Sequence, residues 1–267
     1  MRTRLSPSRR EGNAVRSRLF AGRNARELLR DPLSYLFCIA LPVLMLLMMT
    51  VINASLPGEA QVATFQIASL APGILVFGFT FLMLFACLQV SKDRSSAFLL
   101  RLYASPLTAW EYLCGYALPL LAVGLAQCAV TFAVSAAVAA ASGTAFSLGG
   151  MALSALSLIP AAFLFIGLGV LLGTLFSDKS GPPVSSLLIT AASVLGGIWM
   201  DVEAIGGTLR RVCLSLPFYH AVRAARGAAT GTPDGVWVSL AVVTASAALT
   251  WAVAAAVFRW NMRRDIR

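Results

Sequence analysis

Long apolar stretches dominate the pattern of hydrophobic and polar positions along this chain. No Asp, Glu, Lys or Arg occurs in residues 32–58, 60–91 or 112–177, and residues 179–201 carry charge only at their two ends. A helix that crosses the roughly 30 Å apolar core of a bilayer needs about 20 such residues. The pattern therefore predicts an integral membrane protein built from membrane-spanning helices.

The third stretch is long enough for two helices, and the segment SGTAFSLGG (142–150) divides it because its Gly and Ser residues favour a turn. Asp31 and Pro32 mark the start of the first helix, as its N-cap and its first helical residue. We predict one transmembrane domain, residues 1–267, with an all-α fold. Its six membrane-spanning helices are expected at residues 33–52, 67–89, 112–141, 151–177, 181–200 and 236–257.

Composition agrees with this prediction. Of the 267 residues, 58% are hydrophobic and 12% are charged, and the mean hydropathy is +0.81. Soluble domains carry about 25% charged residues, roughly twice this share. The five cysteines are scattered, and most lie in or beside apolar stretches, which favours small buried residues over disulfides or metal ligands.

The Lys and Arg residues predict the orientation of the helices, because cytoplasmic loops carry an excess of them. Nine arginines precede the first predicted span, and further Lys and Arg residues follow the second, fourth and sixth spans. The opposite face has basic residues only in its last loop, at Arg210, Arg211, Arg223 and Arg226. We therefore expect a multi-pass protein of the cell membrane with both termini in the cytoplasm. The net charge of +10 reflects this orientation and attraction to anionic lipid, since the chain has no nucleic-acid-binding motif.

Two segments on the predicted cytoplasmic face combine charged and apolar side chains. Residues 14–31 mix arginines with apolar residues, which is typical of a basic amphipathic helix lying in the membrane interface. Residues 92–111 predict a short helix, then a corner where Pro106 forces Ser105 out of the helical region, then a capping box that ends at Glu111. Such a rigid segment fits either a protein that presses on it or the membrane surface, and its leucines favour a protein.

The last outer segment, residues 201–235, is too long and too apolar for a simple turn. Its apolar spacing predicts two short helices that meet at Pro217 and dip back into the membrane as a re-entrant hairpin. Its four arginines have three interpretations: they meet lipid head groups, they meet an anionic substrate, or they are simply solvated.

Small and aromatic residues inside the predicted spans each have two interpretations. Gly167, Gly169 and Gly173 permit close packing of helices, either within the chain or between subunits. Phe77 and Phe81 recur at helical spacing, which fits core packing or the lining of a path for a hydrophobic substrate.

Signatures of enzymes are nearly missing from the sequence. His220 is the only histidine, so one chain cannot hold a multi-histidine metal site, and no G-x-S-x-G motif accompanies it. The segment GTLFSDKS (173–180) looks like a phosphate-binding loop, but Asp178 occupies the position of an essential glycine. We therefore expect no metal, nucleotide or other cofactor on this chain. An intramembrane enzyme and a structural or regulatory membrane subunit are the alternative functions.

Three regions of the sequence together resemble the membrane subunits of type-2 ATP-binding-cassette (ABC) exporters. They are LLRDPLSYLFCIALPVLMLLMM (28–49), LLRLYASPLTAWEYLCGYAL (99–118), and LGGIWM (195–200) followed by LPFYHAVRAARG (216–227). Their order and spacing agree with that family over nearly the full chain. One departure is SKDRSSAFLL (91–100), where the family often has a Glu-rich, Gly-Thr stretch.

The resemblance implies an export permease that works as a homodimer or heterodimer with cytoplasmic ABC ATPase subunits, which use ATP and magnesium. Residues 14–31 and 92–111 would dock on the ATPase and transmit its movement to the spans. The implied coupling residues are Arg26, Glu27, Arg30, Asp31, Arg94, Leu99, Arg101, Leu102, Ser105, Pro106 and Glu111. The candidates for a substrate path are Gln66, Ser69, Phe77, Phe81 and Thr190.

Overall fold

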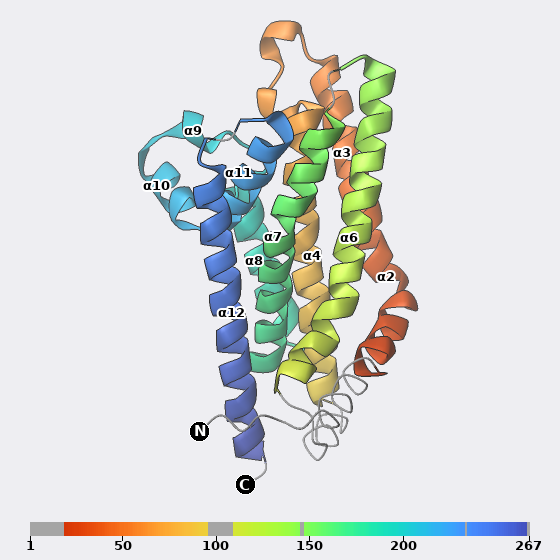
Figure 1. The fold of residues 1–267 in the computed structure, drawn as a ribbon, viewed down its shortest axis with the longest axis vertical. Coiled ribbons are helices and arrows are strands. Elements are labelled where there is room, and N and C mark those ends of the chain that lie inside the picture. Colours follow the sequence, from red (N-terminus) through yellow and green to blue (C-terminus); the bar gives the residue numbers. More distant parts are fainter. Residues whose placement is uncertain (1–18, 96–108, 145–146, 233, 266–267) are drawn as a thin grey trace.

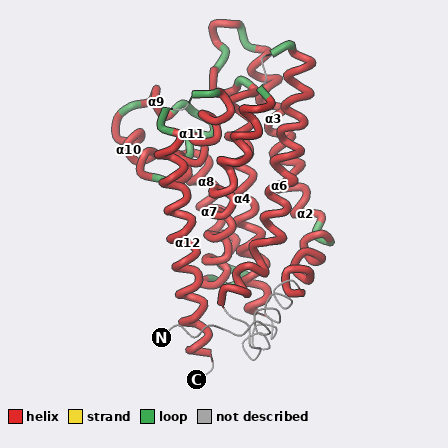
Figure 2. Tube along the Cα trace, viewed as in Figure 1, coloured by secondary structure: helices red, strands yellow, loops and turns green. Residues whose placement is uncertain are grey.

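The computed structural model describes residues 19–95, 109–144, 147–232 and 234–265. Within these residues the chain consists of helices joined by loops, and no strand is present (Figure 2). The long helices run along a common axis as a bundle, and α12 ends at its lower end in Figure 1. We call this end of the bundle the lower end and the opposite one the upper end. The all-α prediction is confirmed for this part of the chain.

The first long helix begins at the predicted residue. The Asp31 carboxylate accepts hydrogen bonds from the Leu33 amide at 3.1 Å and from the Ser34 hydroxyl at 2.8 Å, and Pro32 takes the first helical position. This arrangement satisfies backbone and side-chain donors at the helix start. The helix then passes through three consecutive segments, α2 (Pro32–Tyr35), a π-helical turn (Leu36–Ala40) and α3 (Leu41–Ser55). A separate helix, residues 19–29, precedes it.

The rest of the bundle follows in chain order. Two 3₁₀ turns, Gly58–Ala60 and Ala63–Phe65, cross the upper end. The helices after them are α4 (Ile67–Ser95), α6 (Ala109–Ser142), α7 (Leu148–Leu175), α8 (Gly181–Leu195), α9 (Val202–Ile205), α10 (Gly207–Ser215), α11 (Pro217–Thr230) and α12 (Val236–Asp265).

Helix α4 lies at the centre of the bundle. It packs against α3, α6, α7, α8 and α11. Its most apolar window is 83% buried inside the protein, whereas the corresponding window of the first span, residues 32–55, is only 17% buried. The apolar side chains of α4 therefore form the core of the protein, and those of the first span largely face outward.

Five helices are long and apolar enough to cross a membrane. They are Pro32–Ser55, Ile67–Ser95, Ala109–Ser142, Leu148–Leu175 and Val236–Asn261. Each corresponds to one of the predicted spans, and together they make the chain a multi-pass membrane protein.

The predicted fifth span, residues 181–200, differs from its expected length. Helix α8 has 15 residues and ends at Leu195. At about 1.5 Å per residue it reaches roughly 22 Å, short of the roughly 30 Å bilayer core. Gly196 caps it and Gly197 adopts a positive φ of 69°, so the chain turns where the sequence pattern extends the helix to Met200.

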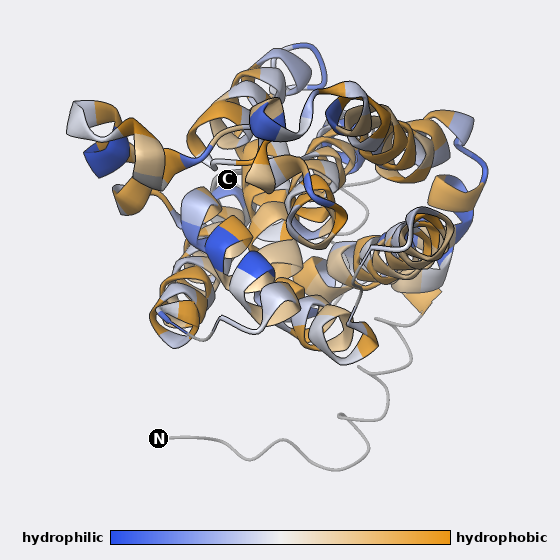
Figure 3. Ribbon diagram, turned by 90° about the horizontal axis from the view of Figure 1, so that it is seen from above, coloured by the Kyte–Doolittle hydropathy of each residue, from blue (hydrophilic) through white to orange (hydrophobic). Residues whose placement is uncertain are grey.

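The segment after α8 forms three short helices at the upper end. Helix α10 ends at Ser215 and α11 begins at Pro217, which is the predicted break. Helix α11 packs against α4, α7 and α12, whereas α10 contacts only its neighbours α9 and α11 among the main helix contacts. In Figure 3, seen from above, α9 and α10 project sideways beyond the bundle.

Two other helix boundaries differ from the sequence prediction. Residues 92–95 continue α4, so Lys92 and Arg94 belong to the central helix and not to a separate short one. The remainder of that predicted helix lies in residues 96–108, outside the described residues. Helix α12 continues past residue 257 to Asp265, because a helix that leaves the membrane can carry charged residues into water.

The small residues of α7 allow two close helix contacts. A Cβ atom at Gly169 would overlap the Met83 carbonyl oxygen of α4, and one at Gly173 would lie 2.7 Å from the Cys87 carbonyl oxygen. Gly167 faces the other way, where a Cβ would lie 2.9 Å from the Trp251 indole nitrogen of α12. Both contacts are within the chain.

Replacing Gly169 by alanine should therefore separate α7 from α4. We expect the free energy of unfolding to fall by about 1–3 kcal/mol, as for other overpacked cores. Thermal unfolding in detergent, followed by tryptophan fluorescence, measures this change. Gly149→Ala is the matched control on the same helix, because Gly149 is exposed and a Cβ atom there would lie 4.0 Å from the nearest atom, the Ser147 hydroxyl oxygen. Equal midpoints for the two variants would contradict the packing account.

Candidate functional site

The helix at residues 19–29 packs directly against the bundle at its lower end. Phe20 is buried and fills the space beside Gly115 of α6, where a Cβ atom would overlap its ring. Its ring lies 5.1 Å from that of Tyr116 in an edge-to-face arrangement and 6.2 Å from that of Tyr112. Apolar contact therefore holds one end of the helix against α6.

An ion pair between a half-buried arginine and a buried carboxylate joins the same helix to α4. The Arg23 guanidinium donates two hydrogen bonds of 2.8 Å to the two carboxylate oxygens of Asp93, and the Tyr116 hydroxyl donates a third, at 2.7 Å. Asp93 is only 3% exposed, so these donors replace the water that its carboxylate has lost. The hydrogen bond to Asp93 raises the pKa of Arg23 above its ordinary value. One carboxylate thus joins three elements.

A second set of hydrogen bonds repeats this connection through amides. The Asn24 side chain, fully buried, donates to the Gly115 carbonyl oxygen of α6 at 3.0 Å. The Gln89 side chain of α4 donates to the Asn24 carbonyl oxygen at 3.3 Å. The helix is therefore bound to both α4 and α6 by side chains that water does not reach.

The ion pairs of Glu27 are more exposed and contribute less to the docking of the helix. The Lys92 ammonium lies 2.8 Å from a Glu27 carboxylate oxygen, and the Arg23 guanidinium lies 3.3 Å from the other. Lys92 is 71% exposed, and ion pairs in such positions contribute about 0–1 kcal/mol. The buried Asp93 interactions thus dominate the docking.

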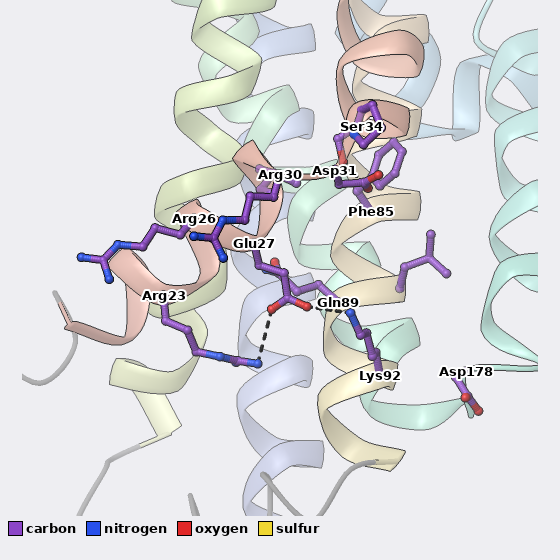
Figure 4. A pocket seen from close by; sticks show the side chains of 13 residues that line it. Arg23, Arg26, Glu27, Arg30, Asp31, Ser34, Phe85, Gln89, Lys92 and Asp178 are labelled. Atoms are coloured by element: carbon purple, nitrogen blue, oxygen red, sulfur yellow. Dashed lines mark hydrogen bonds and ion pairs between the residues drawn. The ribbon is translucent and has the colours of Figure 1, made fainter.

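A cleft of about 870 Å³ opens between the helix, the start of α2 and the lower part of α4. Arg26 and Arg30 line it and are exposed, and Asp178 of the α7–α8 turn lies on its far side (Figure 4). Figure 4 also shows Glu27 reaching from this helix toward Lys92 of α4.

The structure brings part of the predicted coupling set together. Arg26, Glu27, Arg30 and Asp31 all line the cleft. Arg94 donates to the Thr174 carbonyl oxygen at the end of α7, and Glu111 is buried in the first turn of α6. The other predicted coupling residues fall outside the described residues: Leu99, Arg101, Leu102, Ser105 and Pro106.

Sequence reasoning missed the residues that make the buried connection, Arg23, Asn24, Asp93 and Tyr116. Arg23 and Asp93 are 70 positions apart, so no local spacing could pair them. One signal was available, since Asp93 is the single acidic residue among the charged residues that follow a long apolar stretch.

The predicted substrate-path residues do not form one group. Phe77 and Phe81 lie 5.3 Å apart, and Phe77 also packs against Trp199 at 5.5 Å. Gln66 and Thr190 are exposed on other elements. Ser69, in the first turn of α4, accepts a hydrogen bond through its backbone carbonyl.

His220 lies between two helices of the upper end. Its Nδ1 atom is 3.2 Å from the Ser239 hydroxyl of α12, and its Nε2 atom is 3.0 Å from the Leu214 carbonyl oxygen. A serine nucleophile needs both an activating base and room for a substrate. Ser239 is fully buried, so the contact joins α11 to α12 and offers no substrate access.

Comparison with known proteins places the chain in a family. The model of the ABC-2 family transporter proteins matches residues 54–256, which is more than half of the chain. The chain belongs to the ABC-2 transporter family. The match covers α4 to α12 except for the end of α12, so it includes α4 and the helices packed on it apart from α3. A search of curated proteins found no match.

Membership agrees with the resemblance seen in the sequence and gives the protein its general role. An ABC-2 permease is the membrane component of a transporter, and membership of the family implies an ABC ATPase as partner. The docked helix lies at the lower end of this permease, beside the ends of α4 and α6.

Replacing Asp93 by asparagine should release the helix from the permease. The amide cannot accept the bidentate pair, and the loss of hydrogen bonds to a charged acceptor costs about 1–3 kcal/mol, since Arg23 itself is partly exposed and can be hydrated. A spin label at the exposed position 26 should change from restricted to mobile.

Glu27→Gln is the matched control for this prediction, because it removes only the exposed pairs and should leave the label restricted. A label that stays equally restricted in the Asp93→Asn variant would show that the ion pair does not hold the helix.

Proposed function

We propose that this ABC-2 permease is the membrane subunit of an ATP-driven exporter, and that helix 19–29 transmits movement of a separate cytoplasmic ATPase to the spans. The observation that carries the proposal is the buried junction in which Arg23, Asp93 and Tyr116 join this helix to both α4 and α6.

The chemistry of the junction suits mechanical transmission. A bidentate guanidinium–carboxylate pair fixes direction as well as distance, unlike a point contact between charges. Phe20, seated beside Gly115, prevents the helix from sliding along α6. A force on the helix must therefore move the lower ends of α4 and α6, or else separate Arg23 from the buried Asp93 carboxylate.

The chain segment between these two helices supports the same interpretation. Residues 96–108 connect the end of α4 to the start of α6. This segment contains the leucines and the Ser-Pro corner expected to contact the ATPase. A partner bound there would push on the same two helices that helix 19–29 holds, so both contacts would act on one unit.

For the topology we propose both termini in the cytoplasm, with α8 as a sixth crossing. The lower ends of the bundle carry Lys92, Arg94, Lys179 and Arg259, as cytoplasmic ends do. Because α8 is short, residues 196–230 would complete the crossing as a re-entrant segment. Helix α11 packs among α4, α7 and α12, which provides the protein surroundings that irregular backbone needs at membrane depth.

We further propose that the permease works as a pair, with a second copy or a homologous chain. The most apolar windows of the first span and of α12 are each only 17% buried. Their outward faces are thus available to lipid and to a second permease.

Replacing Leu102 by aspartate should abolish capture of the ATPase. A carboxylate in an apolar contact loses its hydration without gaining a partner, so we expect at least a roughly tenfold loss of affinity. The measurement is the amount of ATPase activity that co-purifies with the full-length permease from a native membrane.

Leu209→Asp provides the control, because Leu209 is a half-exposed leucine of α10 at the opposite end of the bundle. ATPase recovery at the wild-type level with Leu102→Asp would contradict the docking assignment. If the wild-type permease recovers the ATPase but ATP causes no movement of helix 19–29, the result would instead favour a regulatory membrane subunit.

A further inference from the structure

Arg226, one of the four arginines of the upper segment, is only partly exposed and is anchored to the protein backbone. Its guanidinium donates three hydrogen bonds to backbone carbonyl oxygens: Nε to Ser69 at 2.9 Å, Nη1 to Gly197 at 2.8 Å and Nη2 to Ile198 at 2.8 Å. Arg226 belongs to α11, Ser69 to the first turn of α4, and the other two residues to the turn after α8. One side chain therefore connects three elements.

The surrounding backbone is shaped to receive this side chain. Helix α8 ends at Leu195 and Gly196 caps it, so the Gly197 and Ile198 carbonyl groups belong to the turn that follows and accept their hydrogen bonds from Arg226 instead of from a helix. Gly197 has a φ of 69°, a conformation that side chains rarely adopt. On the opposite side, a Cβ at Gly73 would lie 2.9 Å from the Arg226 Nη2 atom. Glycine at this position of α4 leaves room for the guanidinium.

The joint separates two different environments. On one side it lines a polar pocket of about 450 Å³ at the upper end, together with Asp201 and Tyr219. On the other side Trp199, which directly follows the bonded turn, packs against Phe77 of α4. The turn that Arg226 holds thus leads directly into Trp199, whose ring lies against α4.

We propose that Arg226 is a positioning residue that keeps the upper exit of the permease closed, and that the transport cycle must release its three hydrogen bonds to open it. The inference rests on the proposed export function for its role in the cycle. The closure itself is a property of this chain, and it can be tested without the ATPase.

The geometry explains why arginine is required. The guanidinium is planar and carries donors that point in several fixed directions, so it can reach carbonyl groups of two elements at once. A lysine ammonium is a single point and cannot span the same three acceptors. An alanine leaves the Ser69 carbonyl group and the two carbonyl groups of the turn after α8 without this donor.

The test uses Ser193→Cys as a reporter of water entering below the joint. Ser193 lies in the last turn of α8 and is 7% exposed. Ser185→Cys, fully buried near the start of the same helix, reports general loosening. Each is placed in the full-length permease in nanodiscs, and the reaction rate with a charged maleimide is measured by mass spectrometry of the peptide that contains it.

We expect Arg226→Ala to raise the rate at position 193 by about tenfold, since three hydrogen bonds from a charged donor are lost. The rate at position 185 should stay unchanged. Arg226→Lys should fall between wild type and Arg226→Ala. Gly73→Ala should also raise the rate at 193, because it pushes the guanidinium aside while Arg226 remains. Arg210→Ala, which removes the same charge from an exposed site, should have no effect.

Two results would overturn the proposal. One is an unchanged rate at position 193 in Arg226→Ala and Gly73→Ala. The other is an equal rise at positions 193 and 185, which would show that Arg226 only stabilises the fold. The export proposal fails in a different measurement, the co-purification assay, if the permease recruits no ATPase. The two failures are therefore distinguishable.

Discussion

The structure depends on one constraint: α4 is surrounded by protein along most of its length. Helices α3, α6, α7, α8 and α11 pack on it, and the close contact with α7 requires glycines because backbone meets backbone there. The first span and α12 are much less buried, and most of their surface faces outward. A helix enclosed in this way cannot shift without its neighbours, so α4 is the natural element through which the two ends of the permease are connected.

An arginine holds each end of α4. At the lower end Arg23 pairs with Asp93, and at the upper end Arg226 bonds to the Ser69 carbonyl. Both arginines come from other segments of the chain, and the fixed fork of the guanidinium suits each. The lower junction binds the helix proposed to meet the ATPase, and the upper one holds the proposed exit. We propose that ATP-driven movement of the ATPase displaces the lower junction, that α4 transmits this displacement, and that the hydrogen bonds of the upper junction then break.

The sequence predicts the parts of this fold that follow from local patterns. Apolar length locates five spans, Asp31 marks a helix start, and Pro217 marks a helix break. It fails where distant segments meet, because pairing of Arg23 with Asp93 depends on how the helices pack. It also extends α8 too far: apolar residues continue to position 200, but Gly197 turns the chain to present carbonyl groups to Arg226. Charge alone could not separate Arg226, which is anchored to three carbonyl groups, from the exposed Arg210 and Arg211.

The central claim is that the two junctions communicate through α4. The most direct measurement is the maleimide reaction rate at Ser193→Cys in the purified permease–ATPase complex, with and without trapped ATP. The account predicts that ATP raises this rate, and that Asp93→Asn abolishes the rise while the ATPase stays bound through the segment between α4 and α6. A rise that persists in the Asp93→Asn complex would contradict transmission through the lower junction.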